Sequence, residues 1–509
     1  MNWQQLPRPH AGAAPAFADP VAAQGWLASI AALPPAAALA ALGAQVDAVD
    51  GAGWSGPNVV QSLNALRAAA VPLHALAEGD YARKALPLDE GAERVFATAE
   101  RFWRHLAIAY LRAAPQCTPA NRCLPLQRAT HALRLAQHTA FVAGRTIHAG
   151  LDPLFATALG LAEANGVLDR PLADADFPNE GKGTISGQLA WALMLRLLDP
   201  YHLTLVQLPF ANRLLRRWRE LTSLQASPGT VRRAHLLDIG HLLGCPLPPE
   251  ASRYLNLRSI SHKLAGRIQA LEAGESPEAL NLGRALSTAA ALRLLKDFEH
   301  HLVRRIRPGG APAGDFELVF GAEGAYAVFK NRLLNATGRD DVSHETDVYR
   351  RPMLPSVAQA QRTTATPLKV AGEHWRCTGD GGAVRAAGST GGRHAAPCLV
   401  SAMIGKRPRL GILGSLRSAD DGTLSGEIDW LEGEIEAGCL RQLLPRGDRQ
   451  LRIPAFALRA GDALSLILPP EAGTRLGVRQ DLAGMPLPDA TPDEVVTRGS
   501  DFVLFACTP

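Results

Sequence analysis

The sequence predicts a multidomain α+β protein, in which an all-α N-terminal region precedes a C-terminal antiparallel β-barrel region. Three observations lead to this prediction. Apolar residues repeat at helical spacing over most of residues 18–308. A stretch rich in Pro and Gly, Arg307 to Gly314, then interrupts the chain. Beyond it, short apolar runs alternate with turn residues, which is typical of antiparallel strands in a barrel.

Length and composition indicate a globular protein of several domains. With about 100–200 residues per domain, 509 residues correspond to two to four domains. Hydrophobic residues make up 47% of the chain and charged residues 20%, which is enough apolar material for a sizeable core. The net charge of +5 is small for this length, so charge alone argues for neither nucleic-acid nor membrane binding.

Cysteine usage and hydropathy predict a cytoplasmic protein without direct membrane insertion. The seven cysteines are an odd number, are widely spaced and contain no CxxC pair, which excludes the common zinc and redox motifs. The N-terminus lacks a basic segment followed by an apolar run, so no secretory signal is predicted. The most apolar stretch, Leu189 to Leu198, is short and contains Arg196, and a bilayer span needs about 20 apolar residues.

The helical region shows its pattern best between Arg94 and Arg112. Apolar residues recur there at steps of three and four, which predicts an amphipathic helix: Val95, Ala99, Phe102, Leu106 and Tyr110. A break rich in Pro and polar residues at 114–125 predicts two helical subdomains, 1–116 and 117–308. Residues 169–184 carry Gly, Pro, Asp and Asn, and are predicted to form a long loop.

The region 309–509 is predicted to be built from short strands. The expected strands are residues 316–320, 398–404, 410–416, 424–431, 463–468 and 501–506. Asp420-Asp421-Gly422 between two apolar runs is a hairpin signal. Residues 386–397 are expected to form a flexible loop. The region holds either one barrel or two, and a split between two would lie near residue 445.

No catalytic or metal-binding constellation is present in the sequence. GxSxG, the Walker A motif and HExxH are all absent. His131 and His138 are seven residues apart and share one face of a predicted helix, where a hydrogen-bonded structural role is favoured over metal ligation. We therefore predict no enzyme activity, no catalytic residue, no metal and no cofactor. A buried cleft with converging histidines and carboxylates would reopen the question.

A basic cluster follows one predicted helix and surrounds Trp218; its members are Arg213, Arg216, Arg217 and Arg219. Arginines beside an aromatic ring can bind phosphate and stack on a base. Trp218, however, belongs to the apolar stripe formed with Leu214 and Leu221. The arginines are therefore predicted to form a solvated helix face, and no nucleic-acid partner is expected.

The β region carries a recognisable succession of segments. A strand enters a polar, Gly-rich turn at Trp375 to Arg385, and three strands follow at Leu399–Ile404, Pro408–Leu416 and Leu424–Leu431. This order resembles the PilZ family, whose members bind cyclic di-GMP. Tyr81 to Leu86 and Asp199 to Leu203 are similar to the long N-terminal region of large PilZ proteins from proteobacteria. The resemblance implies a bacterial signalling protein with cyclic di-GMP as a potential ligand.

The ligand motif of that family is changed in this chain. PilZ domains carry RxxxR ahead of the barrel, whose guanidinium groups hold phosphates and stack on guanines, and a D/N-x-S-x-x-G turn. The resemblance places Thr378, Asp380 and Ala383 at the three marked positions of the turn. The arginines ahead of the barrel lack the RxxxR spacing. The candidate ligand-binding residues are Arg350, Arg351, Arg362, Thr378, Asp380 and Gly382.

Two functional hypotheses remain open. In the first, the degenerate barrel has lost its ligand and mediates protein–protein contacts as a regulatory or scaffold module in cyclic di-GMP-type signalling. In the second, the chain is a cyclic di-GMP receptor with a non-standard site, and Arg350 and Arg351 close onto the barrel when the ligand binds. The three substitutions in the turn favour the first hypothesis. Both imply a protein partner whose identity the sequence does not reveal.

Overall fold

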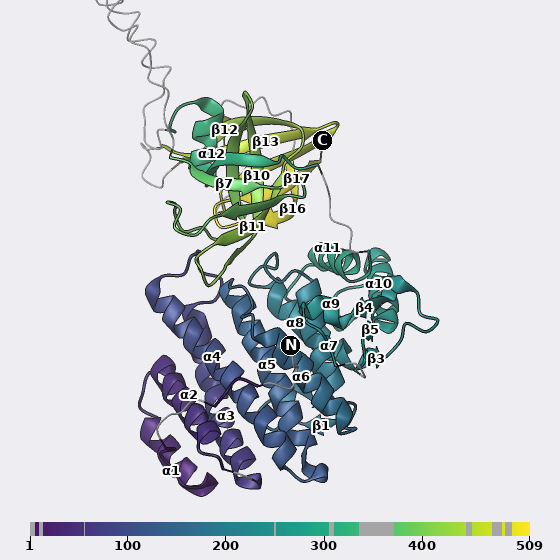
Figure 1. Ribbon diagram of the computed structural model, residues 1–509. Coiled ribbons are helices and arrows are strands. Elements are labelled where there is room, and N and C mark those ends of the chain that lie inside the picture. The colour runs from purple at the N-terminus through teal and green to yellow at the C-terminus, as the bar shows by residue number, and fades with distance from the viewer. Residues whose placement is uncertain are drawn as a thin grey trace, which may run out of the picture. The chain divides into compact units, whose positions relative to one another are not determined.

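The structure, a computed structural model, describes residues 6–9, 14–54, 56–248, 251–304, 310–334, 371–443, 450–470, 481–483 and 491–508. The chain forms two compact units (Figure 1). Unit 1 comprises Met1–Lys84 and Leu88–Ile306, and unit 2 comprises Ala85–Pro87 and Arg307–Pro509. An α-helical region followed by an antiparallel barrel confirms the predicted fold class.

Unit 1 is mainly helical. Its helices are α1 (Pro20–Ile30), α2 (Pro35–Gly51), α3 (Pro57–Ala77), α4 (Glu90–Ala113), α5 (Cys123–Ala143), α6 (Leu151–Ala164), α7 (Ile185–Leu197), α8 (Gln207–Trp218), α9 (Ile239–Leu243), α10 (Arg258–Glu272) and α11 (Thr288–Glu299). Side chains cap several N-termini, as Asp89 does for α4 and Thr184 for α7. Across the described residues, no helix combines the length and apolarity that crossing a bilayer requires.

One hydrophobic core runs through unit 1. Its buried residues extend from Phe17 in the N-terminal segment to Leu302 near the end of the unit. The break predicted near residue 116 contains two short 3₁₀ turns, Ala114–Gln116 and Pro119–Asn121, which reverse the chain so that α4 and α5 pack against each other. The core is therefore continuous across that position. Almost every residue of α5 is buried, which makes α5 the central helix of the unit.

Five short strands interrupt the helices between residues 172 and 256, a region in which we expected almost only helix. β1 (Leu172–Ala173) pairs with β2 (Lys182–Gly183), and β3 (Ser223–Gln225), β5 (Tyr254–Asn256) and β4 (Leu236–Asp238) form a small antiparallel sheet. Strands of two or three residues leave no period in the sequence. The predicted loop at 169–184 is thus a hairpin, closed by β1 and β2 and containing the 3₁₀ turn η4 (Pro178–Glu180).

Unit 2 begins with a closed antiparallel barrel. Its strand order is β10-β11-β8-β7-β6-β9, with β6 (Gly314–Phe320), β7 (Glu373–Cys377), β8 (Gly382–Arg385), β9 (Cys398–Ile404), β10 (Arg407–Ser418) and β11 (Leu424–Trp430). The hairpin signal at Asp420-Asp421-Gly422 connects β10 to β11, and Gly422 supplies the positive φ of 86° that this turn requires. Burial alternates along β7, where Trp375 and Cys377 point into the barrel.

A second sheet of six strands follows the barrel. Its order is β15-β12-β13-β14-β17-β16, with β12 (Glu434–Leu443), β13 (Gln450–Ala460), β14 (Ala463–Leu468), β15 (Asp481–Ala483), β16 (Thr491–Arg498) and β17 (Val503–Thr508). Because β12 and β13 pair with each other, the split expected near residue 445 falls between two partners in one sheet. Helix α12 (Ala322–Lys330) shares a core with both sheets through Tyr326, Leu399 and Phe456.

Unit 2 includes one segment from far upstream in the chain. Leu86 forms an antiparallel bridge with His394, with backbone N–H to oxygen distances of 2.8 and 2.9 Å. Arg393 also donates to the carbonyl oxygen of Ala85 through Nη2, at 3.2 Å. Residues 386–397, predicted to be a flexible loop, are therefore anchored by backbone pairing at their C-terminal end.

Candidate functional site

The β7–β8 turn contains three of the predicted ligand-binding residues. The Thr378 hydroxyl donates to Asp380 Oδ1 at 2.5 Å, and the Thr378 amide donates to the Gly382 carbonyl at 2.8 Å. Asp380 Oδ1 also accepts from the Gly382 amide at 3.3 Å. Gly381, with a φ of 88°, completes the turn. The polar groups of Thr378, Asp380 and Gly382 are thus brought together and bond to one another.

This turn presents a carboxylate rather than a set of phosphate donors. A ligand that carries negative charge would meet the Asp380 side chain first, at an exposed position. The three predicted arginines, Arg350, Arg351 and Arg362, lie outside the residues that the structure describes.

A buried polar group lies beside the barrel and was not anticipated from the sequence. Glu373 accepts from Arg385 Nη1 at 2.7 Å, from the Gly392 amide at 2.6 Å and from His394 Nε2 at 2.8 Å. Burial alone would raise the pKa of Glu373, but these hydrogen bonds lower it to about 2. The His394 ring also stacks on Phe320, with a centroid distance of 3.9 Å. This group fixes the loop that pairs with Leu86.

The largest collection of buried charge lies in unit 1, between α3, α5 and the hairpin at 172–183. We call the guanidinium groups of Arg67, Arg128, Arg134 and Arg219 the arginine cluster, and the hairpin that carries Asp174, Asp176 and Glu180 the acidic hairpin. All four arginines are at most 7% exposed. The sequence places them on three separate elements, α3, α5 and the 3₁₀ turn η5 (Arg219–Leu221).

Asp174 occupies one end of the arginine cluster. Arg67 holds its carboxylate in a bidentate arrangement, with Nη1 to Oδ1 at 3.1 Å and Nη2 to Oδ2 at 2.5 Å. Arg128 forms a second ion pair with the same carboxylate, and Asp176 also pairs with Arg67. Burial would raise the pKa of Asp174, but the hydrogen bonds and charges of Arg67 and Arg128 lower it to about 2.

Glu180 occupies the other end. Its carboxylate accepts from Arg134 Nη2 at 2.9 Å and from Arg219 Nη1 at 3.4 Å, and the pKa of Glu180 falls well below its usual value because these charges outweigh burial. Arg219 also donates from Nη2 to the backbone oxygens of Glu180 and Lys182, at 3.0 and 3.3 Å. At each end one carboxylate is therefore held by two guanidinium groups, and at the Asp174 end Asp176 adds a second carboxylate on Arg67.

His131 lies between the two ends. Arg67 Nη2 is 2.8 Å from its Nδ1, and Arg134 Nη2 is 2.7 Å from its Nε2. Nε2 also lies 3.3 Å from Glu180 Oε2. Burial, together with the neighbouring arginines, lowers the pKa of His131 to about 4, so the ring is neutral near pH 7. The predicted hydrogen-bonded role of this histidine agrees with this geometry.

Two aromatic rings flank the arginine cluster. The Arg134 guanidinium lies 3.5 Å from the centroid of the Trp191 ring, and that of Arg219 lies 5.5 Å from it. On the hairpin side, Phe177 lies 5.0 Å from the Arg67 guanidinium and 4.5 Å from the His131 ring. Guanidinium groups stacked on aromatic faces are typical of sites that recognise planar, negatively charged molecules.

The local sequence explains how the acidic hairpin reaches the cluster. Gln127 of α5 donates from Nε2 to the carbonyls of Leu172 and Gly183, at 3.1 and 3.0 Å, and so holds the base of the hairpin. Residue 183 must be glycine for Arg219 to fit, because a Cβ there would lie 2.4 Å from Arg219 Nη2. The Asp174 side chain also accepts from the Asp176 amide at 3.0 Å, which turns the chain inside the hairpin.

Arg219 corrects one prediction. The arginines around Trp218 were expected to form a solvated face, but Arg219 is 2% exposed because α8 ends at Trp218 and the 3₁₀ turn directs the next side chain inward. Arg217 is exposed as expected. The burial of Trp218, 3% exposed, confirms its assignment to the apolar stripe. In the sequence, the indication that Arg219 is buried is the residue that follows it, Glu220, which carries the opposite charge.

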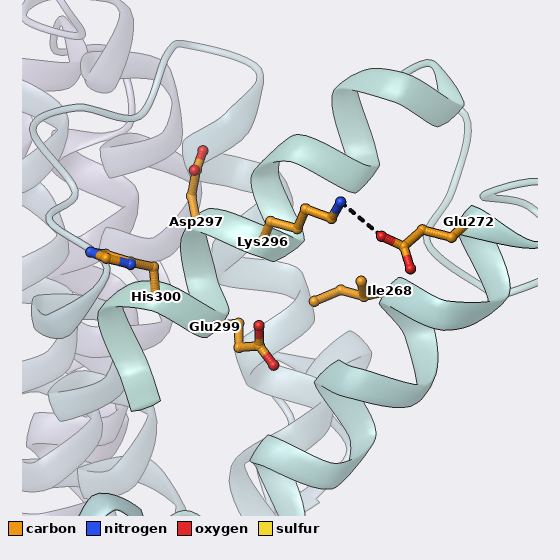
Figure 2. Close-up of a pocket in the computed structure, with 6 residues that line it drawn as sticks. All are labelled: Ile268, Glu272, Lys296, Asp297, Glu299 and His300. Carbon is orange, nitrogen blue, oxygen red and sulfur yellow. Dashed lines mark ion pairs between the residues drawn. The ribbon is translucent and has the colours of Figure 1, made fainter. Parts of the chain in front are cut away.

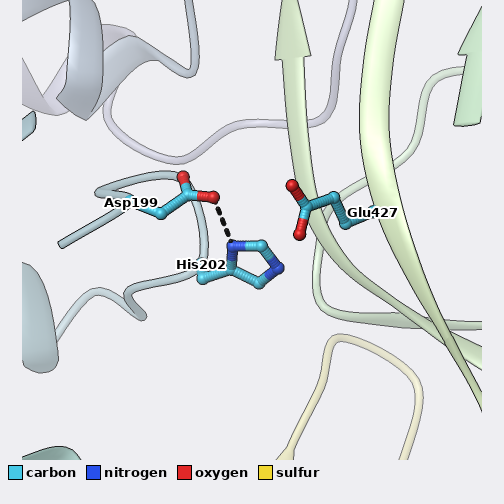
Figure 3. A group of neighbouring side chains, drawn as sticks. All are labelled: Asp199, His202 and Glu427. Carbon is cyan, nitrogen blue, oxygen red and sulfur yellow. Dashed lines mark hydrogen bonds and ion pairs between the residues drawn. The ribbon is translucent and has the colours of Figure 1, made fainter. Parts of the chain in front are cut away.

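The two short motifs that resembled PilZ N-terminal regions meet in unit 1. Arg83 donates to the carbonyl of Pro200, and also to that of Tyr201 at 3.4 Å. Next to this contact, His202 Nδ1 and Asp199 Oδ2 are 2.9 Å apart (Figure 3). Burial lowers the pKa of Arg83 to about 10. These contacts connect the ends of two segments and supply no ligand site by themselves.

A polar pocket of about 540 Å³ lies between α10 and α11 (Figure 2). Ile268, Glu272, Lys296, Asp297, Glu299 and His300 line it. Lys296 Nζ and Glu272 Oε1 pair at 2.7 Å, and both side chains are about half exposed, at 51% and 48%. An exposed ion pair of this kind contributes little to the stability of the fold. The arginine cluster, with four buried cations, is therefore the stronger candidate for function.

Comparison with known families gives one result. Residues 21–229, less than half of the chain, match the family model described as "Cyclic-di-GMP receptor FimW, N-terminal domain". The matched stretch contains the whole arginine cluster and the acidic hairpin. No curated protein matches the chain. No solved structure matches it either.

Proposed function

We propose that this chain is a non-enzymatic regulatory protein that binds cyclic di-GMP, with a helical N-terminal unit and a PilZ-like barrel. One observation carries the proposal: a stretch matching the N-terminal domain of a cyclic di-GMP receptor precedes a closed antiparallel barrel. The strand order through the β7–β8 turn is the part of the sequence that resembles PilZ. In this proposal the protein acts in the cytoplasm, in keeping with seven cysteines that form no disulfide in the described structure.

The proposed ligand site of the barrel consists of Arg350, Arg351 and Arg362 together with Thr378, Asp380 and Gly382. The arginines would hold the two phosphates, since guanidinium groups bind phosphate oxygens bidentately. Asp380 would accept hydrogen bonds from the edge of a guanine, because its charge is unfavourable beside a phosphate. The arginines belong to the chain between α12 and β7, and a protein partner would recognise the ligand-bound form.

A second candidate function is a scaffold whose barrel binds no ligand and contacts a protein partner. The Thr378–Asp380 hydrogen bond favours this alternative, because the turn uses its own polar groups to bond to one another. Under this alternative the partner recognises the barrel without a ligand.

Isothermal titration calorimetry on the full-length protein distinguishes the two candidates. We expect saturable binding of cyclic di-GMP with a dissociation constant in the micromolar range or below, and no binding of GTP at the same concentrations. Arg350→Ala combined with Arg351→Ala should abolish binding to the barrel site. The control is Arg407→Ala combined with Arg409→Ala, which removes two exposed charges from β10.

The outcomes separate clearly. Loss of binding in the first double variant, with normal binding in the control, supports the receptor and its site. Binding of unchanged affinity and stoichiometry in both double variants contradicts the site assignment. Absence of heat with wild-type protein at high cyclic di-GMP concentration leaves the scaffold alternative.

A further inference from the structure

We propose that the arginine cluster of unit 1 is a second anion-binding site, whose ligand carries two phosphate groups and a planar base, and which the acidic hairpin fills in this structure. The hairpin carboxylates stand where the phosphates would bind. Recognition of the phosphates does not depend on the proposed function of the barrel. The identification of cyclic di-GMP as the natural ligand does rest on that function.

The first argument is an excess of buried donors over acceptors. The Nε–H groups of Arg67 and Arg128 have no hydrogen-bond acceptor among the residues that the structure describes. The Arg67 side chain is fully buried, and that of Arg128 is 9% exposed. A buried guanidinium donor without an acceptor is costly. A phosphate offers more acceptor oxygens than a carboxylate, so it can satisfy donors that Asp174 leaves without a partner.

The second argument is the repeated geometry of the two ends. At one end Asp174 is held by Arg67 and Arg128, and at the other Glu180 is held by Arg134 and Arg219. Two guanidinium groups around one anion is an arrangement suited to phosphate. Because the ends repeat it, the cluster can take a molecule with two negative groups. Two phosphodiesters would replace the charges of Asp174 and Glu180, while the charge of Asp176 would leave with the hairpin.

The third argument concerns the planar groups. Phe177 belongs to the acidic hairpin and packs against the His131 ring and the Arg67 guanidinium. When the hairpin leaves, Phe177 leaves with it, and the planar surfaces of His131 and Arg67 become available. A nucleotide base would take the place of the phenyl ring, because bases stack on aromatic and guanidinium planes.

The hairpin has few other attachments. β1 and β2 pair through only two residues each, and Ala173, Ala175, Pro178 and Asn179 are exposed. Phe177 and Leu172 pack against the core, and Gln127 and Arg219 bind the hairpin backbone. The remaining contacts are those of its carboxylates: the ion pairs with the arginines and the bonds of Glu180 with His131 and Gln188. An anion that binds the guanidinium groups would therefore replace the ion pairs that hold the hairpin carboxylates in place.

The test is rescue of a charge-removed variant by an added anion. Glu180→Gln leaves Arg134 without a carboxylate and Arg219 with Glu220 alone, so the thermal midpoint of the full-length protein should fall. Sodium pyrophosphate, as a probe with two phosphates, should restore it. We expect a rise of roughly 5–10 °C at about 100 times the dissociation constant, and a smaller rise for the wild type. Asp174→Asn tests the other end in the same way and serves if Glu180→Gln does not fold.

Asp50→Asn is the matched control, because it removes the carboxylate of the Arg112–Asp50 pair elsewhere in unit 1. Equal stabilisation of this control and the cluster variants by pyrophosphate, or no stabilisation of either, overturns the proposal. Selective rescue of the cluster variants supports it. Selective rescue by pyrophosphate without rescue by cyclic di-GMP supports the anion site and contradicts cyclic di-GMP as its ligand.

Hydrogen exchange in the wild-type protein provides a second readout. Saturating pyrophosphate should accelerate amide exchange in residues 172–183, because the hairpin is displaced while the helices remain folded. Unchanged or slower exchange in that segment, at a concentration that rescues the variants, contradicts displacement of the hairpin.

Discussion

Arg134 stacks on Trp191, with its guanidinium carbon 3.5 Å from the centroid of the indole ring. The same guanidinium donates to Glu180 and, through Nε at 3.1 Å, to Gln188 Oε1. One face and two nitrogen atoms of this guanidinium are thus in contact inside the core of unit 1. The stacking fixes α5 against α7 at the level of the acidic hairpin.

Arg134→Met should destabilise unit 1 by about 3–5 kcal/mol, because Glu180 then loses a buried partner. Denaturant unfolding followed by helical circular dichroism measures this change. Arg94→Met is the control, since the Arg94–Glu90 pair is 73% and 85% exposed and should change stability by less than about 0.5 kcal/mol. Equal effects of the two variants would contradict a structural role for the cluster.

Gly183→Ala should reduce stability by more than about 1 kcal/mol. The new Cβ would lie 2.4 Å from Nη2 of Arg219, which is buried and cannot move aside. Gly43→Ala in α2 offers a matched comparison, because no atom lies within 4 Å of the Cβ that it would add. The midpoint of thermal unfolding should therefore fall clearly for the first variant and little for the second.

Unit 1 should lose stability as the pH falls from 6.5 towards 4. Burial lowers the pKa of His74 and of His131 to about 4 and that of His138 to about 3. In this range the unfolded chain binds protons that the folded chain does not, so protonation favours unfolding. His138→Leu should flatten the dependence of the thermal midpoint on pH over this range. His241→Leu, at an exposed position, should leave the slope as in the wild type.

Unit 2 should show its own acid transition at lower pH. The pKa of Glu373 is about 2 in the folded protein and about 4.5 unfolded, so its contribution is complete above pH 4.5 and is lost as the pH falls towards 2. Glu373→Gln should weaken unit 2 by about 2–4 kcal/mol at neutral pH and remove this slope. Asp315→Asn, which breaks the exposed pair with Arg376, should do neither.

Local patterns predicted most of the fold. The strands at Cys398–Ile404 and Ala463–Leu468 lie where alternation and turn residues placed them, and α4 covers the predicted stripe. Periodicity reports which face of an element is buried, and that information is contained in neighbouring residues. The strands of two or three residues in unit 1 were missed because no period fits in so few positions.

The arginine cluster was not predictable in the same way. Arg67 and Asp174 are 107 residues apart, and Arg134 and Glu180 are 46 apart. The composition of the acidic hairpin is that of a solvent-exposed loop, and only the packing of α3 and α5 shows that its carboxylates are buried. The candidate residues of the β7–β8 turn were placed correctly as a turn between strands, while their role in ligand binding stays a prediction.

The bridge between Leu86 and His394 means that the backbone passes between the two units three times, after Lys84, after Pro87 and after Ile306. A gene fragment that starts at residue 307 therefore encodes an incomplete unit 2, which lacks the backbone groups of Leu86 that His394 pairs with. To keep this pairing, an excised unit 2 would need residues 85–87 supplied together with residues 307–509.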